Sequence, residues 1–222
     1  MNFCSCMFRD TGYFGGYPNE NEFLELRAHG IQVFVDLTTP SERSFLPFVY
    51  TRSYSSSITY INFPIQDNRI PKNKKEFLHL VQEVAELLLS GEKVYIHCKG
   101  GHGRSGVLVA SLLCLLHNIS PDHALRVCSQ LHSKRPNLKQ KWKHVQCPQM
   151  MIQQKFVMDI FRPMVVTYSD YHKYVSSEPQ EFFSRLGIRP IHKNSPRLIN
   201  ELVTYVRDVL NQSKKIIQQE NK

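Results

Sequence analysis

The chain has 222 residues, of which 41% are hydrophobic and 21% charged, and its formal net charge is +9. This composition is ordinary for a globular protein with one good core. No apolar run reaches the roughly 18 residues of a membrane span, and the N-terminus lacks a signal-peptide pattern, so we expect a cytoplasmic location, with the nucleus as an alternative. The positive charge suits an acidic ligand such as a phosphoprotein, a phosphoinositide or RNA, without choosing among them.

The first half of the chain predicts helices and strands in alternation. A helix-like stretch over 20–28 precedes a buried strand over 31–37, and Gly30 separates the two. Residues 53–59 are polar and predict a loop, which a short strand over 60–63 follows. Apolar residues at helical spacing then predict a helix that ends at Gly91: Phe77, Leu80, Val81, Val84, Leu87 and Leu88.

The following segment continues the alternation. A strand over 93–97 leads through a glycine-rich turn into a strongly apolar helix over 107–116. Ser120-Pro121 marks the start of a helix that runs to about His132, and residues 149–161 are again helical. We therefore expect an α/β fold with a mainly parallel central sheet and helices on both faces. Ligands of such sheets bind at the carboxyl ends of the strands, which is where Cys98 lies.

The pattern changes from Val165 onward. Three tyrosines and two serines suggest a connector, and Pro196 opens a final amphipathic helix. We divide the chain into a domain over 1–165 and a helical C-terminal extension over 166–222. The extension is interpreted as a helix docked on the core, with a partner-binding helix or the beginning of a longer protein as alternatives.

Six cysteines are scattered without the spacing of a disulfide framework, which favours reduced thiols. Cys114 and Cys128 fall within helix-like apolar patterns and are expected in the core. Cys4 and Cys6 are interpreted as exposed thiols, with acylation or redox chemistry as alternatives.

The most informative segment is His97-Cys98-Lys99-Gly100-Gly101-His102-Gly103-Arg104-Ser105-Gly106. Its glycines let successive backbone N–H groups point inward, and the helix that starts near Gly103 adds its positive dipole, so the turn can hold an anion. These groups and Arg104 are expected to stabilise a thiolate at Cys98. That thiolate can attack phosphorus while the arginine binds two phosphate oxygens.

Other interpretations of this segment fit less well. It lacks G-x-x-x-x-G-K-S/T, the phosphate-loop pattern of nucleotide-binding proteins. No C-x2-C pair accompanies it to complete a zinc-ligand set, so zinc is disfavoured. We expect neither a metal nor another cofactor.

The segment resembles the active-site loop H-C-x-x-G-x-x-R-S/T-G of the cysteine-dependent protein tyrosine phosphatases. Its surroundings resemble the compact dual-specificity branch, which includes cyclin-kinase-associated phosphatase and small microbial enzymes. The likeness covers about residues 10–162 and extends to Gly15-Gly16-Tyr17-Pro18, to Phe63-Pro64-Ile65-Gln66-Asp67, and to Pro148 with Gln153. It implies a tyrosine-phosphatase-like fold and hydrolysis through a phosphocysteine intermediate.

The resemblance also implies roles outside the nucleophile. Asp67, on a loop stiffened by nearby prolines, would protonate the leaving group and later act as base toward water. Asp36 is a rival acid, but it closes an apolar strand and is interpreted as structural. Ser105 would donate a hydrogen bond to the departing sulfur, and His97 would steady the loop.

Two further assignments are less specific. Gln153, or the neighbouring Gln154, would position the attacking water, although a solvated helix face is equally consistent with the pattern. Lys99, Gly100, Gly101, His102 and Gly103 complete the phosphate-binding segment. Related phosphoinositide phosphatases carry basic residues at the positions of Lys99 and His102. A basic stretch around Trp142 either borders the site or is a solvated loop: Lys134, Arg135, Lys139, Lys141 and Lys143.

The chain lacks the Lys-Asn-Arg-Tyr loop that deepens the pocket of tyrosine-specific relatives. A shallower pocket would admit phosphoserine and phosphothreonine as well as phosphotyrosine, so we expect a dual-specificity phosphatase acting on a phosphorylated protein. The alternatives are a phosphoinositide phosphatase, an RNA 5′-triphosphatase that uses the same loop, and a phosphoprotein-binding module with little turnover. The sequence leaves the oligomeric state open.

Overall fold

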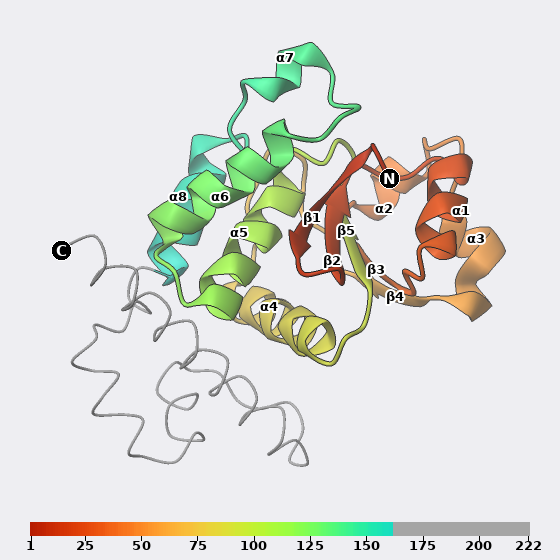
Figure 1. Ribbon diagram of the computed structural model, residues 1–222, viewed down its shortest axis with the longest axis horizontal. Helices are drawn as coiled ribbons and strands as arrows, with labels where there is room; N and C mark the ends of the chain where they lie inside the picture. Colours follow the sequence, from red (N-terminus) through yellow and green to blue (C-terminus); the bar gives the residue numbers. More distant parts are fainter. Residues whose placement is uncertain (162–222) are drawn as a thin grey trace, which may run out of the picture.

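The computed structural model describes residues 1–161 (Figure 1). The extension expected over 166–222, its final helix and the domain boundary at residue 165 lie outside the described residues, so they stay predictions. Among the residues described, no helix is both long enough and apolar enough to cross a membrane.

The centre of the fold is a five-stranded sheet in the order β1-β2-β5-β3-β4. Strands β2 (Gly12–Gly15), β5 (Val94–His97), β3 (Val33–Asp36) and β4 (Thr59–Asn62) run parallel. Strand β1 (Cys4–Phe8) pairs antiparallel with β2 in a hairpin that the sequence did not predict. The mainly parallel sheet is therefore confirmed, and the chain leaves its central strand, β5, directly into Cys98.

Helices cover both faces of this sheet (Figure 1). One face carries α1 (Glu20–Ala28) and α3 (Tyr50–Tyr54), and the other carries α4 (Lys74–Leu89), α5 (Arg104–His117), α6 (Pro121–Ser133) and α8 (Met151–Phe161). Side chains of neighbouring residues in a strand point to opposite faces of the sheet. Tyr95 packs with Phe23 of α1, whereas Ile96 packs with the apolar side of α5.

Three short helical pieces complete the described chain. They are α2 (Pro40–Arg43), the 3-10 turn η1 (Ser55–Ser57) and α7 (Gln140–Lys143). The loop predicted over 53–59 is wrong in part, because α3 and η1 occupy residues 50–57. The predicted start of α6 is confirmed: the Ser120 side chain accepts a hydrogen bond from the backbone of His123, and Pro121 is the first helical residue.

The cysteines divide into buried and exposed thiols. Cys114 and Cys128 are buried, as expected. The interpretation of Cys4 as an exposed thiol is wrong, because it lies in the core beneath α1, and burial raises its pKa to about 11. Cys6 is exposed, as expected.

Candidate active site

The glycine-rich turn between β5 and α5 holds Cys98 at the N-terminus of α5. The backbone N–H of Gly101 donates to the Cys98 Sγ at 3.3 Å, and the Ser105 Oγ lies 3.5 Å from the same sulfur. Gly101 has a φ of +73°, and a Cβ there would lie 2.4 Å from the backbone carbon of Gly15, so only glycine fits. The turn therefore aims an N–H group and a helix N-terminus at the sulfur, which stabilises a thiolate.

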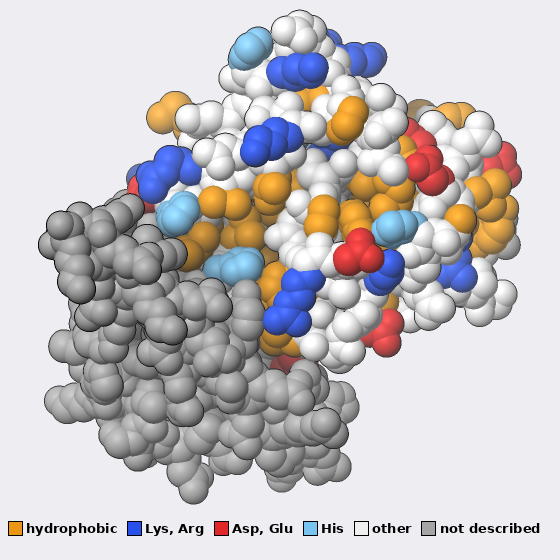
Figure 2. Space-filling model, in the orientation of Figure 1, with side chains coloured by type: hydrophobic (Ala, Val, Ile, Leu, Met, Phe, Trp, Pro, Cys, Tyr) orange, Lys and Arg blue, Asp and Glu red, His pale blue; other side chains and the backbone are white. Residues whose placement is uncertain are grey.

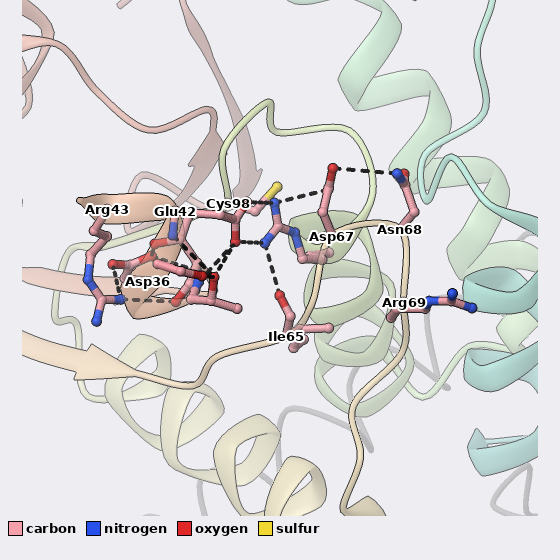
Figure 3. A network of polar contacts seen from close by, with 12 residues as sticks. Asp36, Glu42, Arg43, Ile65, Asp67, Asn68, Arg69 and Cys98 are labelled. Carbon is pink, nitrogen blue, oxygen red and sulfur yellow. Dashed lines mark hydrogen bonds and ion pairs between the residues drawn. The ribbon is translucent and has the colours of Figure 1, made fainter. Parts of the chain in front are cut away.

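Arg104 is the first residue of α5, and its side chain is only 1% exposed. Its Nη1 and Nη2 donate to the two carboxylate oxygens of Glu42 at 2.7 and 2.8 Å, and Nη1 also donates to the Ile65 carbonyl at 2.9 Å. Nη2 lies 3.1 Å from the Asp67 Oδ1. In Figure 3, the labelled Cys98 lies between Glu42 and Asp67. The guanidinium plane is thus fixed in advance of any phosphate.

Glu42 is the residue of this site that sequence reasoning missed. Burial alone would raise the pKa of its carboxyl, but hydrogen bonds from Arg104 and Thr39 outweigh burial and lower the pKa to about 2. For Arg104, burial alone would lower the pKa, but the hydrogen bonds with Glu42 and the negative charges of Cys98, Glu42 and Asp67 raise it. Both groups stay charged, so Glu42 holds the Arg104 guanidinium in a fixed position.

Asp67 lies on the loop that follows β4, and its side chain is 62% exposed. Because it is largely exposed and yet lies against the guanidinium of Arg104, a carboxyl here can exchange a proton with a group bound beside that arginine. Asp36, in contrast, is completely buried and accepts hydrogen bonds from the backbone and hydroxyl of Thr38 and from the Tyr60 hydroxyl. The Asp36 carboxylate is therefore a structural acceptor, away from the reacting centre.

His97 is completely buried beneath the turn. Its Nε2 is hydrogen-bonded to the Tyr50 hydroxyl at 2.8 Å, and its Nδ1 lies 3.8 Å from the Asp36 Oδ1. Burial lowers the pKa of the imidazole, so the ring is neutral in the physiological range. This geometry suits a residue that supports the loop.

The two candidate glutamines on α8 point in different directions. Gln153 is fully buried, and a Cβ on Gly103 would lie 2.9 Å from its Oε1, so its amide lies against the glycine-rich turn. Its Nε2 donates to the Arg69 carbonyl at 2.9 Å, which links α8 to the loop of Asp67. Gln154 instead donates to the Pro148 carbonyl at 2.8 Å. Of the pair, Gln153 is the residue that the fold brings to the site.

The remaining turn residues offer mainly their backbone. Lys99 is exposed, and its carbonyl accepts from the Tyr17 N–H at 3.1 Å. The His102 ring is turned to other residues: its Nδ1 is hydrogen-bonded to the His132 Nε2 at 2.8 Å, and it stacks on Trp142 at 4.3 Å. Burial, with the charges of Arg135 and Lys141, lowers the pKa of His102 to about 4. A neutral, stacked ring argues against the charged phosphate contact expected from this side chain.

Comparison with known proteins agrees with this arrangement. The family described as "Polymorphic toxin system, DSP-PTPase phosphatase" matches residues 12–117. Protein 067L of Invertebrate iridescent virus 3, a tyrosine phosphatase by name, is 34% identical over 207 residues, which cover 90% of this chain and 83% of that protein.

Two solved structures share the fold. Kinase associated phosphatase (KAP), crystallised with its catalytic cysteine replaced by serine, matches with a TM-score of 0.56 and 22% identity, over 71% of this chain and 88% of that one. PTPMT1 in complex with PI(5)P matches with a TM-score of 0.55 and 20% identity, over 73% of this chain and 99% of that one.

Proposed function

Because this chain belongs to the compact cysteine-dependent tyrosine and dual-specificity phosphatases, which are hydrolases, we propose that Cys98 is the nucleophile with which it hydrolyses phosphomonoesters on proteins. One observation carries the assignment. The guanidinium of Arg104, already fixed by Glu42, lies 3.1 Å from the carboxylate of Asp67, and Figure 3 shows Cys98 beside that carboxylate. A nucleophile, a phosphate clamp and a proton donor are thus assembled together.

In the first step the Cys98 thiolate attacks phosphorus. A sulfur–phosphorus bond forms, the bond from phosphorus to the leaving oxygen breaks, and Asp67 gives its proton to that oxygen. The N–H groups of the turn over 99–103 and the fork of Arg104 hold the equatorial oxygens, whose charge is spread in the transition state.

In the second step water attacks the phosphocysteine. Gln153 positions the water, and Asp67, now a carboxylate, takes its proton. The sulfur–phosphorus bond breaks, and the Ser105 hydroxyl donates a hydrogen bond to the sulfur as it leaves. The water oxygen is now bonded to phosphorus, so inorganic phosphate is released and the Cys98 thiolate is regenerated.

We assign phosphotyrosine together with phosphoserine and phosphothreonine as substrates, carried by a phosphorylated protein partner. A phosphoinositide is the second candidate, because Lys99 is exposed on the turn and the structurally similar PTPMT1 is known in complex with PI(5)P. The Asp67 carboxylate, which lies against Arg104 as a proton donor would, disfavours an RNA 5′-triphosphatase. The presence of Cys98, Arg104 and Asp67 together disfavours a binding module without turnover. The cytoplasmic or nuclear location expected from the sequence stays a prediction.

The proposal is tested with a series of aryl phosphates whose leaving groups differ in basicity. Cys98→Ser should abolish hydrolysis of all of them, and vanadate should inhibit the unsubstituted protein. Asp67→Asn should slow esters of basic leaving groups by about 100-fold and activated esters far less, because only the former need the proton. Turnover by Cys98→Ser would refute the nucleophile, and equal slowing of all esters would refute Asp67 as the acid. Phosphopeptides, phosphoinositides and triphosphate-ended RNA assayed in parallel rank the substrate classes.

A further inference from the structure

A second pocket, of about 320 Å³, lies beside the phosphate-binding turn. Gly100 and His102 of the turn form one wall, and Gly16 and Tyr17, which follow β2, form another. Cys98, Arg104 and Asp67 do not line this pocket, so the turn itself separates it from the catalytic centre. The pocket is also lined by Phe3, Glu22, Arg135, Lys139, Lys141 and Trp142.

Arg135 is the most informative residue of this pocket. It is only 5% exposed, its Nε donates to the Ser5 Oγ and its Nη2 donates to the Phe14 carbonyl, both at 3.3 Å. Both acceptors are neutral, and no carboxylate of residues 1–161 lies within ion-pair distance of this guanidinium. A buried positive charge without a counter-charge is costly, and an anion in the adjoining pocket would supply one.

The other charges around the pocket have the same sign. Lys139 and Lys141 are exposed at its rim, and Figure 2 shows basic side chains gathered over the α7 segment at the top of the view. Glu22 is the acidic residue among the lining residues, and its carboxylate already accepts a hydrogen bond from the backbone of Asn19 at 2.9 Å. Three cations therefore face one carboxylate, and that carboxylate serves to cap α1.

We propose that this pocket binds a second phosphate of the substrate, carried by a peptide with two phosphorylated residues close together in sequence, while the first phosphate occupies the turn at Cys98. This inference rests on the proposed function. The arginine fork and two lysines match a phosphate dianion in geometry and charge.

A peptide is favoured over an inositol ring as the carrier. The two sites are separated by the turn, so the two phosphates must be joined by an arm that can pass over Gly100 and His102. A peptide chain offers such an arm, whereas a ring holds its phosphates on rigidly linked carbons. The aromatic side chains of Phe3, Tyr17 and Trp142 provide apolar walls for the stem of a phosphorylated side chain.

The test compares peptides that carry one phosphotyrosine with peptides that also carry a phosphoserine at successive positions on either side. At the best spacing, the second phosphate should raise kcat/KM about tenfold. The ratio between the two peptides should fall close to one in Lys139→Gln/Lys141→Gln. The matched control, Lys74→Gln/Lys75→Gln, removes two exposed lysines from α4, which lies far from α7 in Figure 1, and should keep the ratio.

Three results would overturn the proposal. The first is a ratio near one at every spacing, and the second is an equal fall of the ratio in both double variants. The third is a preference for phosphatidylinositol bisphosphate vesicles over every peptide, if that preference disappears in Lys139→Gln/Lys141→Gln. Calorimetric binding of the same peptides to Cys98→Ser measures the pocket without turnover. A doubly phosphorylated peptide that binds more tightly there supports the pocket even if catalysis by Cys98 fails its own test.

Discussion

Two nearly buried arginines flank the phosphate-binding turn, and they are held in opposite ways. Arg104 donates hydrogen bonds to both carboxylate oxygens of Glu42 and to the Ile65 carbonyl, and it forms an ion pair with Asp67. Arg135 is held by a hydroxyl, a carbonyl and the face of the Phe14 ring, all of them uncharged. The first arginine has its charge balanced and its plane fixed, whereas the second keeps an unbalanced charge beside a pocket.

The difference shows how one turn can serve two tasks. Chemistry requires a rigid fork that does not have to reorganise when charge develops on the phosphate, and paired carboxylates provide that rigidity. Recognition requires an attraction that the protein has not already satisfied, and neutral partners leave that attraction available. Each variant described next changes one of the two arginines or a residue on its side of the turn, so that the other side serves as the reference.

The largest expected effect is at Arg104. Arg104→Lys should lower kcat/KM for a small aryl phosphate by about 100- to 1,000-fold, because an ammonium group cannot bind a carboxylate and a phosphate in two-pronged fashion. Arg135→Lys should cost far less with the same substrate, because Arg135 does not reach the reacting phosphate. Steady-state kinetics of both variants checks the contrast, and similar losses would contradict it.

A smaller effect is expected from the support of Arg104. Glu42→Gln keeps an acceptor but removes the counter-charge, so kcat should fall about tenfold with less change in KM. The free energy of unfolding should fall by about 2 kcal/mol, because the buried guanidinium of Arg104 loses one of its two counter-charges.

Glu76→Gln is the matched control for Glu42→Gln. Glu76 also accepts a hydrogen bond in the first turn of its helix, from Asn73 at 2.8 Å, but it touches no part of the site. Equal kcat values for the two variants would remove Glu42 as a positioning residue.

The smallest effect is on the free energy of unfolding in acid. His102 and His132 lower it in one pH range, and Glu42 lowers it in another. Burial lowers the pKa of His102 to about 4 and that of His132 to about 3, so the unfolded chain binds protons first and stability falls as pH drops below about 6.5. The pKa of Glu42 is lowered to about 2, so its contribution is complete above about pH 4.5 and is lost only below it.

Urea unfolding between pH 6.5 and 4.5 measures the contribution of the histidines to the free energy of unfolding, separately from that of Glu42. His102 and His132 should each account for a loss of about 2 kcal/mol over this range in the unsubstituted protein, and His102→Gln/His132→Gln should lose correspondingly less. Buried His97 and His117 contribute to the remaining slope, because burial lowers their pKa values too. An unchanged slope in the double variant would contradict the assignment.

The parts of the molecule that the sequence predicts best are those whose chemistry is local. The turn from His97 to Gly106 carries its own requirements, including a glycine at 101 with positive φ, so it can be found without the fold. The helix start at Ser120-Pro121 is equally local. The alternation of strands and helices then suffices for a mainly parallel sheet.

The parts that could not be predicted depend on distant contacts. Glu42 lies 62 residues from Arg104, and His132 lies 30 residues from His102, so no local pattern pairs them. The choice between Gln153 and Gln154 depends on how α8 is rotated against the turn. The β1–β2 hairpin has short strands that are buried at every residue except Cys6, which gives little alternation to detect.

The central claim is that Cys98 carries the phosphate between two chemical steps, and rapid acid quenching during turnover tests it directly. Ser105→Ala removes the hydroxyl 3.5 Å from the Cys98 sulfur, so the second step should slow and phosphocysteine should accumulate. Mass spectrometry of the peptide that contains Cys98 should find it phosphorylated, to a greater extent in Ser105→Ala than in the unsubstituted protein, and not at all in Cys98→Ser. Phosphate on another residue, or an unmodified Cys98 in Ser105→Ala during turnover, would contradict the account.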